Sequence, residues 1–292
     1  MLAIRTDLAV EAHALWRESA GETTRLKGVA AREEQVEGLA VTRVEILDQE
    51  GAQALGKPEG VYLTLDVSPL WRREEDAFAR IAGAVAALLG PLLPEEGPVL
   101  VAGLGNPAMT PDALGPRALD HLLMTRHLGE ALPQLRPVAG LGAGVLGTTG
   151  MEAAEWVRGA AEQVKPAAVI VVDALAAREL ERLCATVQIA DTGLAPGSGV
   201  GNHRMALNRE TLGTPVISVG VPTVVDAQTI VRDLLGKDGA APEILGGKGR
   251  RFFVTPESID QKIRDLSRVL GYGMDLALQK ALALEDLEAL LA

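Results

Sequence analysis

Three runs of almost uninterrupted aliphatic residues constrain the fold more than any other feature of the chain. They are PVLVA (98–102), AAVIVV (167–172) and PVISVGV (215–221), and stretches with apolar residues at helical spacing separate them. A strand that is apolar on both faces has to be covered on both faces, which is typical of parallel strands joined by crossover helices. The pattern therefore predicts an α/β fold, with a mostly parallel sheet and helices on both faces.

The other segments fit one large domain built around that sheet, and a chain of 292 residues is long enough for it. Two further strands are expected, over 38–47 and 60–67. Helices are expected over 74–93, 111–128, 150–166 and the end of the run 215–235, and the tail 255–292 is predicted to form two helices broken at GYG. Residues 1–35 are predicted to form a helix, a turn and a flexible link.

The charge balance excludes several classes of partner. The net charge is -11 and the chain contains a single cysteine, Cys184. An acidic chain lacks the basic surface that nucleic acid or an anionic membrane requires, and one cysteine permits no internal disulfide. Neither a secretory signal nor a long apolar span is present in the sequence. We therefore expect a protein of a reducing, intracellular compartment.

The turn after the first apolar run, GLGNPAMTPDALGP (103–116), has three possible interpretations. As a dinucleotide-binding loop it has Gly103 and Gly105, but Ala108 stands where the third glycine belongs, and prolines interrupt the turn. As a plain loop it needs no ligand. As part of a catalytic cleft it presents the carboxylate of Asp112.

A second carboxylate, Asp173, follows the run AAVIVV in the same way. Ligands of open parallel sheets bind at the carboxyl ends of the strands, so Asp112 and Asp173 face one crevice if their strands are neighbours. Two close carboxylates repel, which raises one pKa and leaves one base and one acid, as peptide hydrolysis by an activated water requires. The alternative is that Asp112 caps a helix and Asp173 caps a strand end.

The stretch IADTGLAPGSGVGNHR (189–204) contains the triplet Asp191–Thr192–Gly193, which resembles the active-site triplet of pepsin-like proteases. The triplet occurs once, in a chain that is not rich in strands, so a pepsin fold is not expected. The glycines around Ser198 are compatible with a backbone anion site or with a plain loop.

Other catalytic chemistries lack their local signals. The four histidines form no HExxH motif and no i, i+4 pair, so no metal site and no cofactor are predicted. No GxSxG motif is present either, and Cys184 lies in the helix-like stretch ARELERLCATV, where a buried structural thiol is expected.

Seven stretches taken together resemble the germination proteases of spore-forming bacteria. In chain order they are IRTDLAVEAH, NPAMTPDALGP, GTTGMEAAE, VVDALAAREL, QIADTGLAPGSGVGN, TLGTPVISVGVPTVVDA and FFVTPESID. They span nearly the whole chain, and their order is far more specific than any one of them.

The resemblance implies an endopeptidase that degrades small acid-soluble spore proteins during germination. It also implies an α/β fold similar to the hydrogenase-maturation peptidases (phosphorylase/hydrolase-like), a homotetramer, and a location in the cytoplasm of the forespore. Its two catalytic aspartates match Asp112 and Asp173, the pair reached from the strand ends. Gly105, Asn106, Asp191, Thr192 and Gly193 are expected to line the cleft and bind substrate.

The resemblance further implies an inactive precursor that processes itself. Asp7–Leu8–Ala9 has the acidic–apolar–alanine order of the family's substrates, so we expect cleavage between Asp7 and Leu8. Residues 1–7 would then be a short propeptide, extended and mobile, and 8–292 the peptidase domain. The alternative is an uncut N-terminal helix with Thr6 as its N-cap. Two other functions stay open: a metal-binding maturation peptidase of the same fold, and a non-catalytic spore-protein-binding protein.

Overall fold

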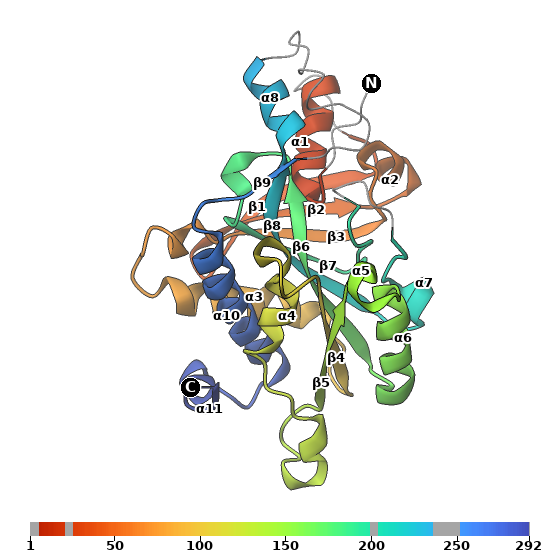
Figure 1. Ribbon diagram of the computed structural model, residues 1–292, viewed down its shortest axis with the longest axis vertical. Coiled ribbons are helices and arrows are strands. Elements are labelled where there is room, and N and C mark those ends of the chain that lie inside the picture. The colour runs from red at the N-terminus through yellow and green to blue at the C-terminus, as the bar shows by residue number, and fades with distance from the viewer. Residues whose placement is uncertain (1–5, 21–25, 199–203, 236–251, 292) are drawn as a thin grey trace.

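A computed structural model describes residues 6–20, 26–198, 204–235 and 252–291 of the chain (Figure 1). Its centre is one nine-stranded sheet with the order β1-β2-β3-β7-β8-β6-β4-β5, and β9 pairs with β8. The strands are β1 (Val29–Val36), β2 (Leu39–Ile46), β3 (Gly60–Asp66), β4 (Val99–Leu104), β5 (Val138–Gly144), β6 (Ala168–Ala177), β7 (Thr186–Ala190), β8 (Val216–Asp226) and β9 (Phe253–Val254).

The α/β class is confirmed, but the sheet is mixed rather than mostly parallel. Strands β8, β6, β4 and β5 pair in parallel, whereas β1, β2, β3, β7 and β9 pair antiparallel. Strand β2 lies within the expected range 38–47, whereas the sequence does not predict β1; the two are joined through Glu37 and Gly38, both with positive φ (51° and 69°). Such a short link with positive φ permits only an antiparallel hairpin.

Helices cover both faces of the sheet, as the apolar runs predict. Alternate residues of β4 separate between two cores: Val99 and Val101 pack under one helical layer, and Leu100 and Ala102 under the other. The first layer contains α3 (Ala77–Leu89), α4 (Leu114–Leu119), α10 (Ile259–Leu278) and α11 (Leu284–Leu291), and the second contains α6 (Ala153–Val164) and α7 (Arg209–Leu212). A third core lies between strands β2 and β3 and the helices α1 (Ala9–Ala20) and α2 (Gln49–Leu55).

The remaining helices are short or lie near the cleft. They are α5 (Leu146–Thr149), α8 (Ala227–Leu235) and the 3-10 helices η1 (Ser68–Leu70), η2 (Gly90–Leu92), η3 (Thr110–Asp112), η4 (Arg126–Ala131) and η5 (Leu180–Arg182). The helix expected over 111–128 is therefore only η3, the short α4 and η4. The stretch around Cys184 is a turn rather than a helix; Cys184 has a φ of 56°, is fully buried, and donates its N–H to the carbonyl of Pro222 at 2.7 Å.

The predicted break of the tail at GYG is wrong, because α10 runs through it. A Cβ on Gly271 would lie 2.4 Å from the carbonyl oxygen of His121, and one on Gly273 would lie 2.7 Å from Val85. The two glycines thus let α10 approach α4 and α3 closely, at the cost of a modest loss of intrinsic helix propensity. The break comes later, between Leu278 and Leu284.

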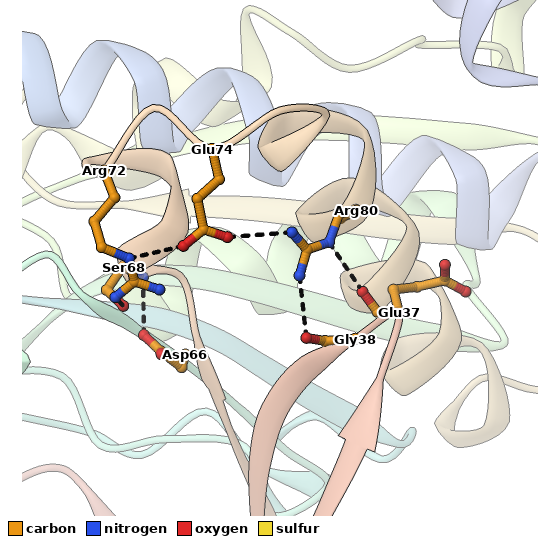
Figure 2. Close-up of polar contacts among 7 residues, drawn as sticks. All are labelled: Glu37, Gly38, Asp66, Ser68, Arg72, Glu74 and Arg80. Atoms are coloured by element: carbon orange, nitrogen blue, oxygen red, sulfur yellow. Dashed lines mark hydrogen bonds and ion pairs between the residues drawn. The ribbon is translucent and has the colours of Figure 1, made fainter.

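A chain of polar contacts ties the β1–β2 hairpin to the start of α3 (Figure 2). Arg80 on α3 donates to the carbonyls of Glu37 and Gly38 at 3.2 and 3.0 Å. It also pairs with Glu74 at 3.3 Å, and Glu74 accepts from Arg72 at 2.8 Å. Exposed ion pairs contribute at most about 1 kcal/mol each, so the apolar core carries the fold and this network fixes the hairpin's position.

Candidate active site

Asp112 is held in a tight turn directly after β4. Gly105 has a φ of 110°, and a Cβ there would lie 1.9 Å from the carbonyl oxygen of Asp112, so only glycine fits. The N–H of Asn106 donates to Oδ2 of Asp112 at 2.7 Å, and the N–H of Asp112 donates to the carbonyl of Met109 at 2.8 Å. The turn therefore orients the carboxylate of Asp112, which also lines a cavity.

Asp173 lies within β6 rather than after it. The β4–β6 pairing ends at Gly103 and Val172, whereas the β6–β8 pairing continues through Asp173 and Gly220. The side chain of Asp173 is 7% exposed, and its Oδ1 accepts from the N–H of Ala174 at 2.9 Å. Strand β6 is paired with β4 and extends past its end, and Asp112 and Asp173 line one cavity there.

The two carboxyl groups differ in electrostatic environment. Burial raises the pKa of Asp112 above its ordinary value, and the hydrogen bond from Asn106 opposes that shift. Burial raises the pKa of Asp173 further, and the negative charges of Asp112 and Asp7 add to the increase. Both shifts favour the protonated carboxyl group, and the larger one, at Asp173, includes repulsion from Asp112.

Two cavities meet at Asp7 and Asp173, which line both. The larger has a volume of about 560 Å³ and is also lined by Gly105, Asp112, Leu146, Arg204 and Phe253, among others. The smaller has a volume of about 190 Å³ and is also lined by Lys57, Gln188, Thr192, Gly193 and Ser198, among others. The catalytic candidates therefore open onto one cavity and the N-terminal segment lies at its junction with the second.

The segment around Asp7 is docked rather than mobile, and the chain bends at Asp7 instead of staying extended. Asp7 donates its N–H to the carbonyl of Ala176 at 3.0 Å, and its Oδ2 accepts from the N–H of Ala176 at 2.9 Å. Oδ1 of Asp7 accepts from the hydroxyl of Ser198 at 2.7 Å. Helix α1 begins at Ala9, after this segment, and Thr6 accepts from the N–H of Leu8 at 3.0 Å instead of starting the helix. Residues 1–5 of the expected propeptide lie outside the described part of the chain.

Of the other expected cleft residues, Gly105, Thr192 and Gly193 line the cavities, whereas Asn106 acts through its N–H to Asp112. Asp191 has a different role: its Oδ1 accepts from the N–H of Val61 at 2.8 Å. This bond continues the β3–β7 pairing, so Asp191 belongs to the sheet edge. The glycine-rich loop continues through 199–203, which lie outside the described residues.

Sequence reasoning missed two polar residues of the smaller cavity, Lys57 and Gln188. Lys57 follows Gly56, the left-handed C-cap of α2, in the turn-like stretch GKPEG. Gln188 lies in the middle of β7, a strand that the sequence pattern does not predict. A lysine in a glycine–proline turn and a glutamine in an apolar strand match no sequence motif. Their position in the cavity is therefore evident only from the folded structure.

Within the described ranges, no group of three histidine, cysteine, aspartate or glutamate side chains is placed to hold a metal ion. In the same ranges, no helix is both long and apolar enough to cross a membrane.

Comparisons with the sequences of known proteins identify one family. The family described as Germination protease (peptidase A25) matches residues 9–237. A germination protease of Caldanaerobacter subterraneus subsp. tengcongensis is 42% identical, with 100% of this chain and 99% of the relative aligned. One from Clostridium perfringens is 39% identical over 100% of both chains, and one from Bacillus cytotoxicus is 37% identical over 94% of each. Among solved structures, the [NiFe] hydrogenase maturation protease HycI of Thermococcus kodakarensis aligns with a TM-score of 0.37 and 19% identity, covering 66% of this chain and 99% of that one.

Proposed function

Because the chain belongs to the germination protease family, we propose that it is an endopeptidase that cleaves small acid-soluble spore proteins when a spore germinates. Membership of the family makes it a protease. The substrate class comes from the resemblance described above, and the acidic–apolar–alanine segment at the chain's own N-terminus supports it.

Asp112 and Asp173 carry the chemistry in this proposal. The ionised Asp112 takes a proton from water, which attacks the carbonyl carbon of the peptide. The protonated Asp173 supplies a proton as the peptide bond breaks, so the pair begins and ends the step with one shared proton. The single observation that carries the proposal is that the segment Asp7–Ala9 is bound beside this pair, with Asp7 lining both cavities.

The bound segment also accounts for the proposed sequence preference. The carboxylate of Asp7 accepts from Ser198 and Ala176. Leu8 is fully buried in an apolar cluster with Leu175, Ala177 and Val225. Ala9 is also fully buried, so a larger side chain would have to displace its neighbours. An acid, an apolar residue and an alanine thus each have a matching environment.

We infer that residues 1–7 are a propeptide and 8–292 the peptidase domain, and that the enzyme releases Met1–Asp7 by its own activity. A tethered segment reaches its own cleft at an effective concentration of about millimolar, which favours both inhibition and self-cleavage. The family resemblance supports a homotetramer in the cytoplasm of the forespore, with no cofactor.

The test is to incubate the purified protein with a small acid-soluble spore protein and identify the products by mass spectrometry. Discrete fragments cut after an acidic residue are expected, and peptides with that acid replaced by lysine should be poor substrates. Intact, bound substrate would instead indicate a binding protein, and activity that depends on a metal found in the purified protein would indicate a metallopeptidase. Equal cutting of acidic and lysine peptides would contradict the preference.

A further inference from the structure

Two donors converge on the carbonyl oxygen of Asp7, the oxygen of the peptide bond that we propose is cut. Nζ of Lys57 lies 2.9 Å from it, and Nε2 of Gln188 lies 3.0 Å from it. Both are hydrogen-bond distances, and one of the donors is a cation. The carbonyl that has to accept negative charge during hydrolysis is therefore already bound by the groups best suited to stabilise that charge.

Gln188 holds the peptide on both sides of Leu8. Its Nε2 donates to the carbonyl of Asp7, and its Oε1 accepts from the N–H of Ala9 at 2.8 Å. Because the amide end uses its donor and its acceptor at once, only one orientation satisfies both contacts. Gln188 is 6% exposed and lies in β7, paired with β3 and β8, so the sheet fixes its position.

Lys57 lies in a setting where its charge acts strongly. Its ammonium also lies 3.4 Å from the carbonyl of Thr6, and within the described ranges no carboxylate forms an ion pair with it. Burial lowers the pKa of Lys57, and the negative charges of Asp7 and Glu11 oppose that shift. The positive charge is thus directed at main-chain carbonyls instead of being neutralised by a direct partner, in a site where electrostatic interactions are weakly screened.

We propose that Lys57 and Gln188 form the site that stabilises the negative charge on the carbonyl oxygen during peptide hydrolysis. This inference rests on the proposed function and adds two catalytic residues to it. The same cavity also contains Asp7 and Asp173, so the donors and the proposed acid act on one peptide bond.

The step balances with these roles. Water oxygen bonds to the carbonyl carbon of Asp7, and its proton passes to Asp112. The electron pair of the C=O bond moves onto the oxygen, where Lys57 and Gln188 donate to it. As the C=O bond re-forms, the bond to the nitrogen of Leu8 breaks, and that nitrogen takes the proton of Asp173. Because the carbonyl oxygen has its own donors, Asp173 is free to protonate the leaving group.

The first experiment measures the first-order rate of self-cleavage in the full chain. Lys57→Met removes the charge and keeps the apolar stem, and we expect a rate about 10²–10³-fold lower. Gln188→Met removes the neutral donor and should slow the reaction less, about 10-fold or more. Lys27→Met is the matched control, because Lys27 is exposed and pairs only at the surface with Glu50, and its rate should be unchanged.

The second experiment separates stabilisation of charge from positioning of the segment. Hydrogen exchange of the Asp7 and Ala9 amides reports docking, since they donate to Ala176 and Gln188. It is measured in the Asp112→Asn chain, which should stay uncut, with and without Lys57→Met. The expected result is unchanged protection of both amides despite the slower cleavage.

Several results would overturn the inference. A wild-type rate in Lys57→Met would show that the cation is not needed, and a slower rate accompanied by lost protection would show that it only positions the segment. If Lys57→Met does not fold, an unchanged rate in Gln188→Met would overturn the inference in the same way. A wild-type chain that never cuts itself would refute the proposed self-processing, whereas a wild type that cuts itself and a Lys57→Met chain that cuts itself equally fast would refute the inference alone.

Discussion

Strand β6 and the end of strand β7 present similar carboxylates, Asp173 and Asp191, with different partners. Asp173 and Asp191 each follow a buried aliphatic run, and each is placed near the cleft by its strand. Asp191 gives its Oδ1 to the N–H of Val61, which completes the pairing of β3 with β7. Asp173 accepts only from the neighbouring Ala174 among the hydrogen bonds described, and it lines both cavities.

The difference separates a carboxylate that extends the sheet from the one that we propose for catalysis. A carboxylate whose oxygen is used by the backbone of a neighbouring strand extends the sheet. A carboxylate that is buried beside other negative charges has a raised pKa. If one of its oxygens is also left for water or substrate, it can exchange a proton with them. The partners of the oxygens, rather than the position along the strand, decide the role.

The largest effect on cleavage is expected when Asp112 or Asp173, the two carboxylates of the cleft, is neutralised. Asp112→Asn and Asp173→Asn should each reduce the cleavage rate by about 10²–10⁴-fold and leave the fold intact, because each removes a positioned acid or base. The rate is measured on a peptide substrate, and circular dichroism checks the fold. Near-normal turnover in either variant would refute the two-carboxylate mechanism.

Asp275 on α10, a buried carboxylate away from the cleft, tests whether burial alone raises the pKa of a carboxyl group. It is fully buried, both its oxygens accept from the N–H of Leu123, and burial raises its pKa from 3.8 to about 7. Because the pKa is raised in the folded chain, the free energy of unfolding should fall as the pH rises from 3.8 to about 7.

Asp275→Asn should remove that fall, and at pH 8 it should be more stable than the wild type by up to about 4 kcal/mol. Urea unfolding at several pH values measures the difference, and the peptidase rate should not change. Glu288→Gln, on the exposed side of α11, is the control. A variant that is less stable than the wild type at pH 8 would show that the hydrogen bonds of the carboxylate outweigh its burial.

Acid recognition by Ser198 should have a smaller effect. Ser198→Ala removes a hydrogen bond to the charged side chain of Asp7, and we expect about 10-fold slower self-cleavage. The double-mutant comparison uses Asp7→Asn with and without Ser198→Ala. Ser198→Ala should reduce the self-cleavage rate less when residue 7 is already neutral. An equal reduction in both backgrounds would show that Ser198 does not recognise the acid.

The smallest effect on catalysis is expected at Asp191, the structural side of the comparison. Asp191→Ala leaves the N–H of Val61 without its partner, which costs about 1 kcal/mol of stability. The cleavage rate should stay within a few-fold of the wild type. A loss of cleavage rate as large as that expected for Asp173→Asn would indicate that Asp191 also takes part in catalysis.

The sequence predicts the parts of this molecule that depend on local pattern. Apolar runs reveal β4, β6 and β8, and the carboxylates after or within them lead to Asp112 and Asp173. In the antiparallel half the sequence predicts β2 and β3, but it does not predict β1, which is polar and largely exposed, or β7, which is only five residues long. The sequence also fails to predict that α10 is continuous, because the glycines of GYG are typical of a helix end. Their role is explained only by the segments that pack against the helix.

The most direct test of the account is the N-terminal sequence of the protein after prolonged incubation. The wild type should begin at Leu8, because the pair Asp112 and Asp173 cuts the bound Asp7–Leu8 bond, and Asp112→Asn should retain Met1. An active enzyme that still begins at Met1 would contradict the account, and so would normal processing in the Asp112→Asn chain.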